Sequence, residues 1–204
     1  MAATAYGLSA VEDRLRSFSY VEFAGGVGAR LGGDHGPAAK KTAKAPPPRY
    51  GLIDSQSVKT QYGSEERGIE GHKKIKGRKR HIVVDPLGNL LPVQVHAAHQ
   101  ADTVAGCAVL ERTARKYPPI EAFCGDQGYR GTAVTFVHEQ LDLVLPIVPR
   151  LGEGFVVQPK RWVVERTFAW LGHFRRLAKD VEILTGTAEN VIRIAMLKTT
   201  LAKC

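Results

Sequence analysis

Residues 161–180 read RWVVERTFAWLGHFRRLAKD and predict a single amphipathic helix, from which the rest of the fold can be argued. Mostly apolar side chains recur at helical spacing and mark the buried face, namely Val163, Thr167, Trp170, Phe174, Leu177 and Val181. A second line, spaced three or four residues apart, holds Arg161, Glu165, Ala169, Gly172 and Arg176. Glycine inside a helix costs about 1 kcal/mol relative to alanine. Either Gly172 gives clearance to a bulky group beside Glu165, or this is a plain core helix with a surface Glu165–Arg161 pair.

The composition indicates one globular domain with a polyanionic partner. The chain has 204 residues, 44% of them hydrophobic, a net charge of +9 and an isoelectric point near 9.6. This balance favours nucleic acid or an acidic membrane surface as partner. No apolar run approaches the roughly 20 residues that span a bilayer, and no secretory signal precedes the domain. The three cysteines are widely separated, so we expect no disulfide framework, no membrane segment and a cytoplasmic location.

Residues 1–49 differ in composition from the remainder of the chain. Residues 25–33 are rich in glycine, and residues 40–48 are rich in lysine and proline. Such a composition buries little surface and predicts an irregular or disordered N-terminal arm. The glycine spacing does not fit a dinucleotide-binding loop. We expect order to begin at Tyr50, which makes residues 50–204 the folded domain.

From Tyr50 onward, the apolar pattern predicts an α/β fold with a mixed sheet flanked by helices. The expected strands cover residues 51–59, 80–85, 90–96, 120–125 and 143–148, and a turn at residues 86–89 joins the second to the third. The expected helices cover residues 103–116, 132–140, 161–180 and 188–202. Asp102 is expected to cap the first of these helices.

A strongly basic run, HKKIKGRKR, occupies residues 72–80. It is either a solvated charge run, a localisation-type signal or a contact surface for the phosphate backbone of DNA. We favour DNA contact because the run leads straight into a strand. The candidate DNA-binding residues here are Lys73, Lys74, Lys76, Arg78, Lys79 and Arg80.

Three acidic residues stand where α/β folds gather their active sites. Asp54 and Asp126 each follow an apolar strand, and Glu165 lies on the helix after the last strand. Turn capping is the ordinary explanation for either aspartate alone. Three carboxylates brought together, however, repel one another unless a cation lies between them. Oxygen ligands select Mg²⁺ or Mn²⁺, and two such ions suit phosphoryl transfer. The sequence therefore predicts a site for two divalent ions.

Four motifs resemble those of bacterial insertion-sequence transposases of the DDE superfamily, with the IS-five group the most similar. They are IDSQSVK at 53–59, KGRKRHIVVD at 76–85, GDQGYRG at 125–131 and RWVVERTFAWL at 161–171. The resemblance implies an RNase H-like fold, Mg²⁺-dependent strand cleavage and strand transfer at element ends, and double-stranded DNA as partner. It also implies that Asp54, Asp126 and Glu165 are the catalytic residues and metal ligands.

The resemblance extends to the surroundings of the acids. Arg161 matches the family's arginine four residues before the glutamate, and Gly128 and Tyr129 match the motif of the second acid. The related IS-four pattern has a lysine and a tyrosine where this chain has Gly172 and Gln158. Further DNA contacts are expected from Arg130, Arg161, Trp162, Arg175, Arg176 and Lys179. We expect Trp162 to stack on unpaired bases and Trp170 to lie in the core.

Two alternatives stay open because family members usually carry a helical N-terminal domain that recognises inverted repeats, which residues 1–49 do not resemble. In the first alternative the chain is a truncated, inactive remnant that binds DNA without sequence preference. In the second it is a related nuclease that acts on RNA–DNA hybrids. A homodimer is one candidate for the oligomeric state, and the expected location is the nucleoid in the bacterial cytoplasm. His96 and His99 lack a third soft ligand and are expected to be ordinary histidines.

Overall fold

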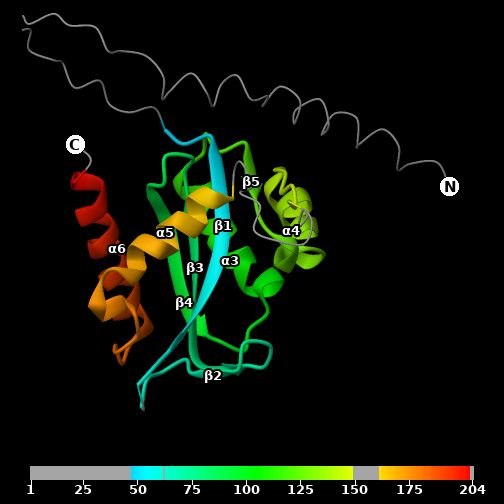
Figure 1. The fold of residues 1–204 in the computed structure, drawn as a ribbon. Coiled ribbons are helices and arrows are strands. Elements are labelled where there is room, and N and C mark those ends of the chain that lie inside the picture. Colours follow the sequence, from blue (N-terminus) through cyan, green and yellow to red (C-terminus); the bar gives the residue numbers. More distant parts are fainter. Residues whose placement is uncertain (1–46, 62, 149–160, 203–204) are drawn as a thin grey trace, which may run out of the picture. The chain divides into compact units, whose positions relative to one another are not determined.

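The computed structural model describes residues 47–61, 63–148 and 161–202 (Figure 1). The strands are β1 (Tyr50–Lys59), β2 (Gly68–Glu70), β3 (Ile75–Val84), β4 (Leu90–Ala97) and β5 (Ala122–Cys124). The helices are α3 (Asp102–Lys116), α4 (Thr132–Leu141), α5 (Trp162–Gly172) and α6 (Thr185–Leu201), with single 3₁₀ turns η1 (Gln127–Tyr129) and η2 (Arg175–Leu177). The predicted arm at 1–49 lies outside the described residues apart from its last three positions, as do residues 149–160 before α5.

The strands form one mixed sheet in the order β2-β3-β1-β5, with β4 also paired to β3. β1 runs antiparallel to β3, with Leu52 opposite Val84 and Lys59 opposite Gly77. β1 runs parallel to β5, and that ladder ends at the pair Leu52 and Cys124. β1 is therefore the central strand, and its second half has β3 as its only named partner strand among the described residues.

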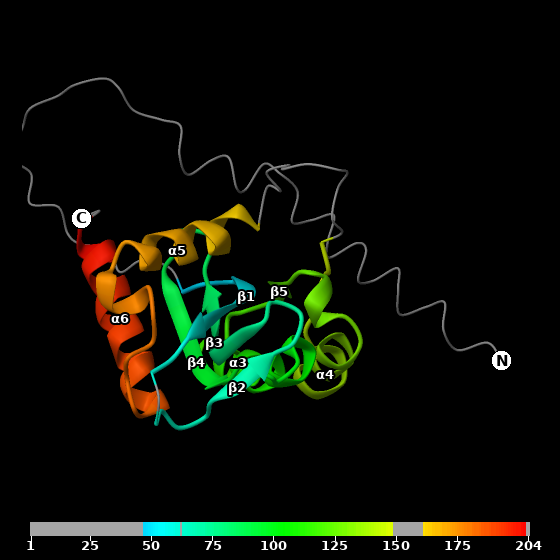
Figure 2. The ribbon, with the colours of Figure 1, turned by 60° about the horizontal axis from the view of Figure 1, so that its bottom comes forward.

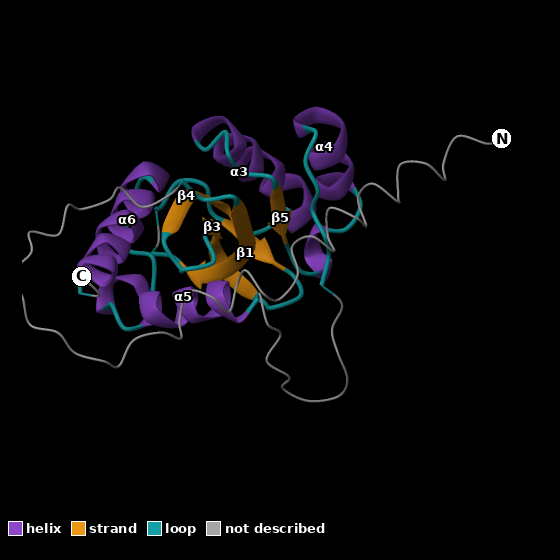
Figure 3. Ribbon diagram, turned by 90° about the horizontal axis from the view of Figure 1, so that it is seen from above, coloured by secondary structure: helices purple, strands orange, loops and turns teal. Residues whose placement is uncertain are grey.

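Helices cover both faces of the sheet, with α5 and α6 on one side and α3 and α4 on the other (Figure 3). α5 lies across β1 and β3, whereas α6 packs against β4 (Figure 2). Successive side chains of β1 point to opposite faces of the sheet and so enter both hydrophobic cores. Leu52 packs in the core on the α5–α6 side, and Ile53 packs in the core on the α3–α4 side. By the same alternation, Asp54 is on the α5 side and Ser55 on the α3 side. The predicted mixed sheet flanked by helices is confirmed.

Three predicted strands differ from those observed. The strand expected at 80–85 begins five residues earlier, because β3 covers Ile75–Val84. β1 does not end at the acid, because Asp54 lies in its middle and pairing with β3 continues to Lys59. The expected strand at 143–148 is reduced to two isolated bridges, which pair Val144 with Ala122 and Ile147 with Gly125. Asp126, in contrast, directly follows β5 and Gly125, as expected for a residue at a strand end.

The prediction of one helix over residues 161–180 is wrong. α5 ends at Gly172, and the chain then tightens into η2. The next segment is drawn back to the sheet, where the Asp180 N–H donates to the Lys59 carbonyl at 2.9 Å. A straight helix cannot make this return. No described atom lies within 4 Å of the Cβ that alanine would add at Gly172, so no described protein group needs the clearance there.

α3 ends at Lys116 as predicted, but it begins one residue earlier than expected, and Asp102 does not cap it. The N-cap residue is Ala101, and Asp102 is the first residue of the helix. Its carboxylate turns inward instead and accepts hydrogen bonds from Ser55 and Lys79. Because Ser55 and Lys79 are stronger donors than the backbone N–H groups at the helix start, the Asp102 carboxylate binds them and does not cap the helix.

Candidate active site

Asp54 and Asp126 lie at the point where β1 and β5 separate. The β1–β5 ladder ends at Leu52 and Cys124, and each acid comes two residues later on its own segment. Two-residue spacing keeps both side chains on the face of Leu52 and Cys124, which belong to the core under α5. The separation of the two strands therefore leaves Asp54 and Asp126 half-buried at the same level of the sheet.

The turn after β5 orients Asp126. Its Oδ1 accepts a hydrogen bond from the Gly128 N–H at 2.9 Å, which caps η1. A Cβ at Gly128 would lie 3.0 Å from that oxygen, closer than most side chains tolerate. The turn-capping explanation for Asp126 is thus observed, and the same bond fixes the direction of its carboxylate.

Glu165 projects from the first turn of α5 and is paired with Arg161. The Arg161 guanidinium donates to Glu165 Oε1 at 2.8 Å, and the two side chains are 20% and 45% exposed respectively. The predicted surface pair is therefore confirmed. A carboxylate in a first helical turn is also stabilised by the helix dipole.

The pKa of Asp54 depends on its burial and on the charged groups around it. Burial raises the pKa of Asp54 to about 7, against an opposing hydrogen bond from the Ser55 N–H at 2.7 Å. The negative charges of Asp126 and Glu165 raise this pKa further, whereas Arg161 lowers it. Elements far apart in the sequence have thus brought three carboxylates and one guanidinium within interaction range.

The carboxylates suit a hard divalent cation in their chemistry. Among the described residues, no three His, Cys, Asp or Glu side chains are close enough, as they stand, to hold an ion. Glu165 is turned to Arg161, while Asp54 and Asp126 each bind a backbone N–H with one oxygen. Oxygen-only donors are those that Mg²⁺ and Mn²⁺ take. The raised pKa of Asp54 also reflects negative charge that a cation would relieve.

Half of the basic run is buried, so the prediction that it contacts DNA is wrong for Arg78, Lys79 and Arg80. Their relative exposures are 0%, 3% and 1%. They belong to β3, which is covered on both faces, so alternate side chains enter opposite cores. Lys79 donates to the Gln100 carbonyl at 2.9 Å, and Arg80 donates to the Leu177 carbonyl at 2.8 Å.

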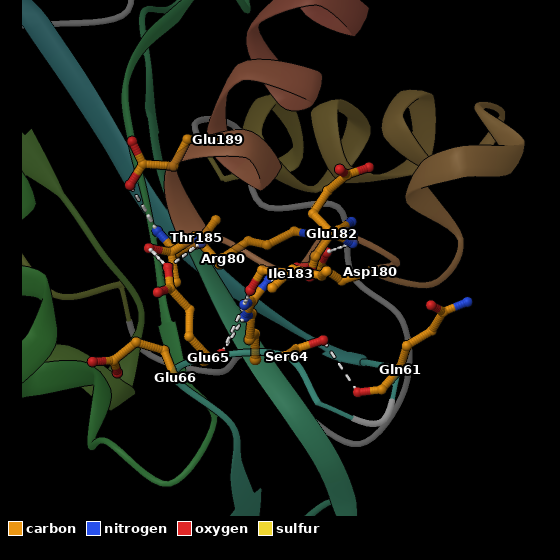
Figure 4. Close-up of polar contacts among 12 residues, drawn as sticks. Gln61, Ser64, Glu65, Glu66, Arg80, Asp180, Glu182, Ile183, Thr185 and Glu189 are labelled. Atoms are coloured by element: carbon orange, nitrogen blue, oxygen red, sulfur yellow. Dashed lines mark hydrogen bonds and ion pairs between the residues drawn. The ribbon is translucent and has the colours of Figure 1, made fainter.

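The Arg78 guanidinium joins the sheet to the segment between α5 and α6. It pairs with Asp180 at 3.3 Å and donates to the carbonyls of Glu182, Ile183 and Glu65. Figure 4 shows Glu65, Asp180 and Glu182 gathered at this junction, with Thr185 beside Glu65. A buried guanidinium with this many acceptors links two parts of the fold and does not contact a phosphate.

The remaining predicted DNA contacts lie on the surface. Lys73, Lys74 and Lys76 are exposed at the turn between β2 and β3 and at the start of β3. Arg130 is exposed just after η1, Trp162 begins α5, and Arg175, Arg176 and Lys179 are exposed in and after η2. Arg176 also donates to Glu182 at 2.8 Å. Their contact with DNA stays a prediction.

Arg166 is a residue that the sequence did not single out. Its guanidinium lies over the rings of both Trp162 and Trp170, 4.2 and 4.4 Å from their centroids. It also reaches the Leu87 carbonyl, in the turn between β3 and β4, at 3.4 Å. The spacing of four residues between Trp162, Arg166 and Trp170 was the available signal. The stack fixes the exposed Trp162 ring one helical turn from Glu165.

Comparisons with known proteins give the following matches. The family model described as "Transposase DDE domain" matches residues 45–197. No curated protein sequence matches the chain. The catalytic core domain of BIV integrase matches with a TM-score of 0.44 and 12% identity, over 73% of this chain and 81% of that one. A chain of the simian T-cell lymphotropic virus intasome, solved in complex with PP2A regulatory subunit B56 gamma, matches with a TM-score of 0.44 and 12% identity, over 74% of this chain and 47% of that one. No helix among the described residues is long and apolar enough to cross a bilayer.

Proposed function

Because the chain belongs to the transposase DDE domain family, we propose that it cleaves DNA strands at the ends of an insertion sequence and joins them to target DNA, using Mg²⁺ or Mn²⁺. The observation that carries the proposal is the electrostatic coupling of three acids from separate elements. Asp126 and Glu165 both act on Asp54, whose pKa is raised to about 7. A carboxyl group perturbed by burial and by neighbouring acids is a mark of a functional site.

The residues would divide the work as follows. Asp54 on the central strand and Asp126 on the η1 turn would hold the cations, and Glu165 would complete the set by turning from Arg161. Two bound ions would supply an activated water or 3′-hydroxyl nucleophile and a stabilised leaving oxygen. Arg161, once released from Glu165, would be free to bind a DNA phosphate next to the reacting bond.

The exposed basic residues would hold the DNA around this acidic centre. Lys73, Lys74 and Lys76 at one end of the sheet, and the cluster Arg175, Arg176 and Lys179 around η2, would contact phosphates. Trp162, held by Arg166, would stack on an unpaired base beside Glu165. The domain would act on DNA in the bacterial cytoplasm, and a homodimer would present two such sites to the two ends of an element.

The proposal is tested by nicking of supercoiled plasmid with the full chain in Mg²⁺ or Mn²⁺. Asp54→Ala, Asp126→Ala and Glu165→Ala should each reduce nicking by at least about 10²-fold, as expected when transition-state stabilisation of roughly 3 kcal/mol is lost. Glu139→Ala, which changes an exposed acid on α4, is the control and should nick like the wild type. DNA affinity, measured by fluorescence anisotropy, should change little in all four.

The outcomes also separate the two alternatives. If the wild type binds DNA but makes no metal-dependent product, the chain is a binding remnant. If RNA–DNA hybrids are cut faster than plasmid DNA, it is a nuclease on the same fold. If the three acid variants nick as fast as the wild type, the assigned site is wrong.

A further inference from the structure

A polar cluster with Asp102 at its centre lies on the α3 side of the sheet, directly behind the acidic site. Asp102 Oδ1 accepts hydrogen bonds from Ser55 Oγ at 2.8 Å and from Lys79 Nζ at 3.0 Å, and His81 Nε2 lies 3.3 Å away. Burial opposes ionisation of Asp102, but the hydrogen bonds that it accepts from Lys79 and Ser55 lower its pKa well below the usual value. Asp102 is therefore a fixed negative charge that the predicted active site does not use.

The cluster is anchored by two histidines, of which His96 is buried behind His81. The Ala97 carbonyl, 2.9 Å from His96 Nδ1, can only accept, so His96 donates from that nitrogen. His81 Nδ1 must then donate to His96 Nε2, at 2.7 Å. This leaves neutral His81 without a proton to offer Asp102, and burial lowers the pKa of His81. Lys79 and Ser55 are thus the firm partners of Asp102.

Ser55 connects Asp102 to the first acid through the strand. The hydroxyl of Ser55 donates to Asp102 on the α3 side, and the backbone N–H of the same residue donates to Asp54 Oδ1 at 2.7 Å. β5 has already left β1 at this level, so no β5 ladder bond fixes this peptide. The hydroxyl bond to Asp102 restrains the peptide in its place, and the N–H in turn orients the Asp54 carboxylate.

The start of α3 also restrains the turn that carries the second acid. Thr103, the residue after Asp102, donates from its hydroxyl to the Arg130 carbonyl at 2.9 Å and accepts from the Ala133 N–H at 2.9 Å. The η1 turn is thus tied on its far side to the same helix end that holds Ser55.

We propose that Asp102 is a positioning residue that orients the carboxylate of Asp54, the acid that would bind the divalent ions together with Asp126. It acts through Ser55, whose hydroxyl donates to Asp102 and whose N–H donates to Asp54. The inference rests on the proposed function, in which those two acids bind the divalent ions. Groups that orient metal ligands from behind typically contribute 10–100-fold to metal affinity.

The test is Mn²⁺ binding to the full chain, measured from the bound fraction in electron paramagnetic resonance and from the Mn²⁺-induced rise in melting temperature. Ser55→Ala, which removes one hydroxyl, and Asp102→Asn, which keeps the shape and removes the charge, should each raise the Kd for Mn²⁺ about 10-fold or more. Ser57→Ala is the matched control, since Ser57 lies on the same strand and face but its hydroxyl bonds to Glu70. Its Kd should equal that of the wild type.

A merely structural role would lower the melting temperature of Ser55→Ala and Asp102→Asn without changing their Kd for Mn²⁺, and this result overturns the inference. Nicking gives the second readout: excess Mn²⁺ should restore it in both variants, and should not restore it in Asp54→Ala. If Asp102→Asn fails to fold, Ser55→Ala alone decides. Failure of Asp54→Ala to weaken Mn²⁺ binding would instead overturn the proposed function itself.

Discussion

Arg161 donates to Glu165 at 2.8 Å across one turn of α5 and so occupies an oxygen that the proposed cation site requires. Both residues are partly exposed, and helical pairs of this kind contribute only about 0.3–0.5 kcal/mol. A bound cation or a DNA phosphate can therefore displace the pair at little cost. The bond holds the acid near the site until a ligand arrives.

Arg161→Ala should strengthen Mn²⁺ binding about twofold, the equivalent of the pair's own roughly 0.4 kcal/mol, and should weaken DNA binding. Titration with Mn²⁺ and DNA affinity measured by anisotropy report the two effects separately. Arg193→Ala is the control, because Arg193 forms the same kind of pair with Glu189 on α6 at 2.7 Å. Weaker Mn²⁺ binding in Arg161→Ala would contradict the prediction.

Asp54→Asn should be more stable than the wild type at pH 8 in EDTA, and the difference should shrink toward pH 4. The pKa of Asp54 is raised by burial to about 7 in the folded chain, from 3.8. The folded state therefore holds a proton that the unfolded state releases, so wild-type stability falls as the pH rises between these values. Melting temperatures measured across this range test it; a difference independent of pH would show that Asp54 is not perturbed.

Arg78→Met should lower the free energy of unfolding by roughly 3–5 kcal/mol, because it leaves the buried Asp180 without its partner. Lys74→Met and Lys76→Met, at exposed positions of the same basic run, should stay within about 0.5 kcal/mol of the wild type. Each should instead reduce the slope of log K against log salt for DNA binding by about 1. Urea denaturation and salt titrations distinguish the two kinds of residue; a stable Arg78→Met with a reduced salt slope would restore Arg78 as a DNA contact.

Gly77→Ala should destabilise the fold by roughly 3 kcal/mol, the upper end of ordinary overpacking. The added Cβ would lie 2.0 Å from the Val58 carbonyl oxygen and 2.9 Å from the Thr60 nitrogen, both backbone atoms of the partner segment. Gly186→Ala is the control: it lies in α6 with no heavy atom within 4 Å of the new Cβ, and should gain up to about 1 kcal/mol. Equal denaturation midpoints for the two variants would contradict the packing argument.

Local pattern was enough to predict the two helices on the α3–α4 side of the sheet. α3 ends at Lys116 as predicted, and α4 differs by one residue at its end. The transposase resemblance is confirmed by the family match, and the mixed sheet flanked by helices is observed. Periodicity succeeds here because each of these segments buries one face along its whole length.

The sequence predictions were wrong where partners far away in the sequence determine the position of a side chain. Arg78 and Arg80 look like surface charge in the basic run, but they are enclosed by carbonyls about a hundred positions further along the chain. Asp102 looks like a helix cap, yet Ser55 and Lys79, on two different strands, attract its carboxylate more strongly. No spacing rule within one segment reports such partners, because they exist only once the sheet has formed.

The contacts of Arg78 with the segment between α5 and α6 also have a consequence during synthesis on the ribosome. β3 leaves the exit tunnel well before the Glu182 carbonyl, which lies 104 positions later and is one of the acceptors that make burial of Arg78 tolerable. Until that segment emerges, the nascent chain carries a guanidinium that the sheet cannot enclose without a large desolvation cost. Copies of the gene interrupted upstream of that point would thus yield polypeptides that remain open to chaperones and proteases.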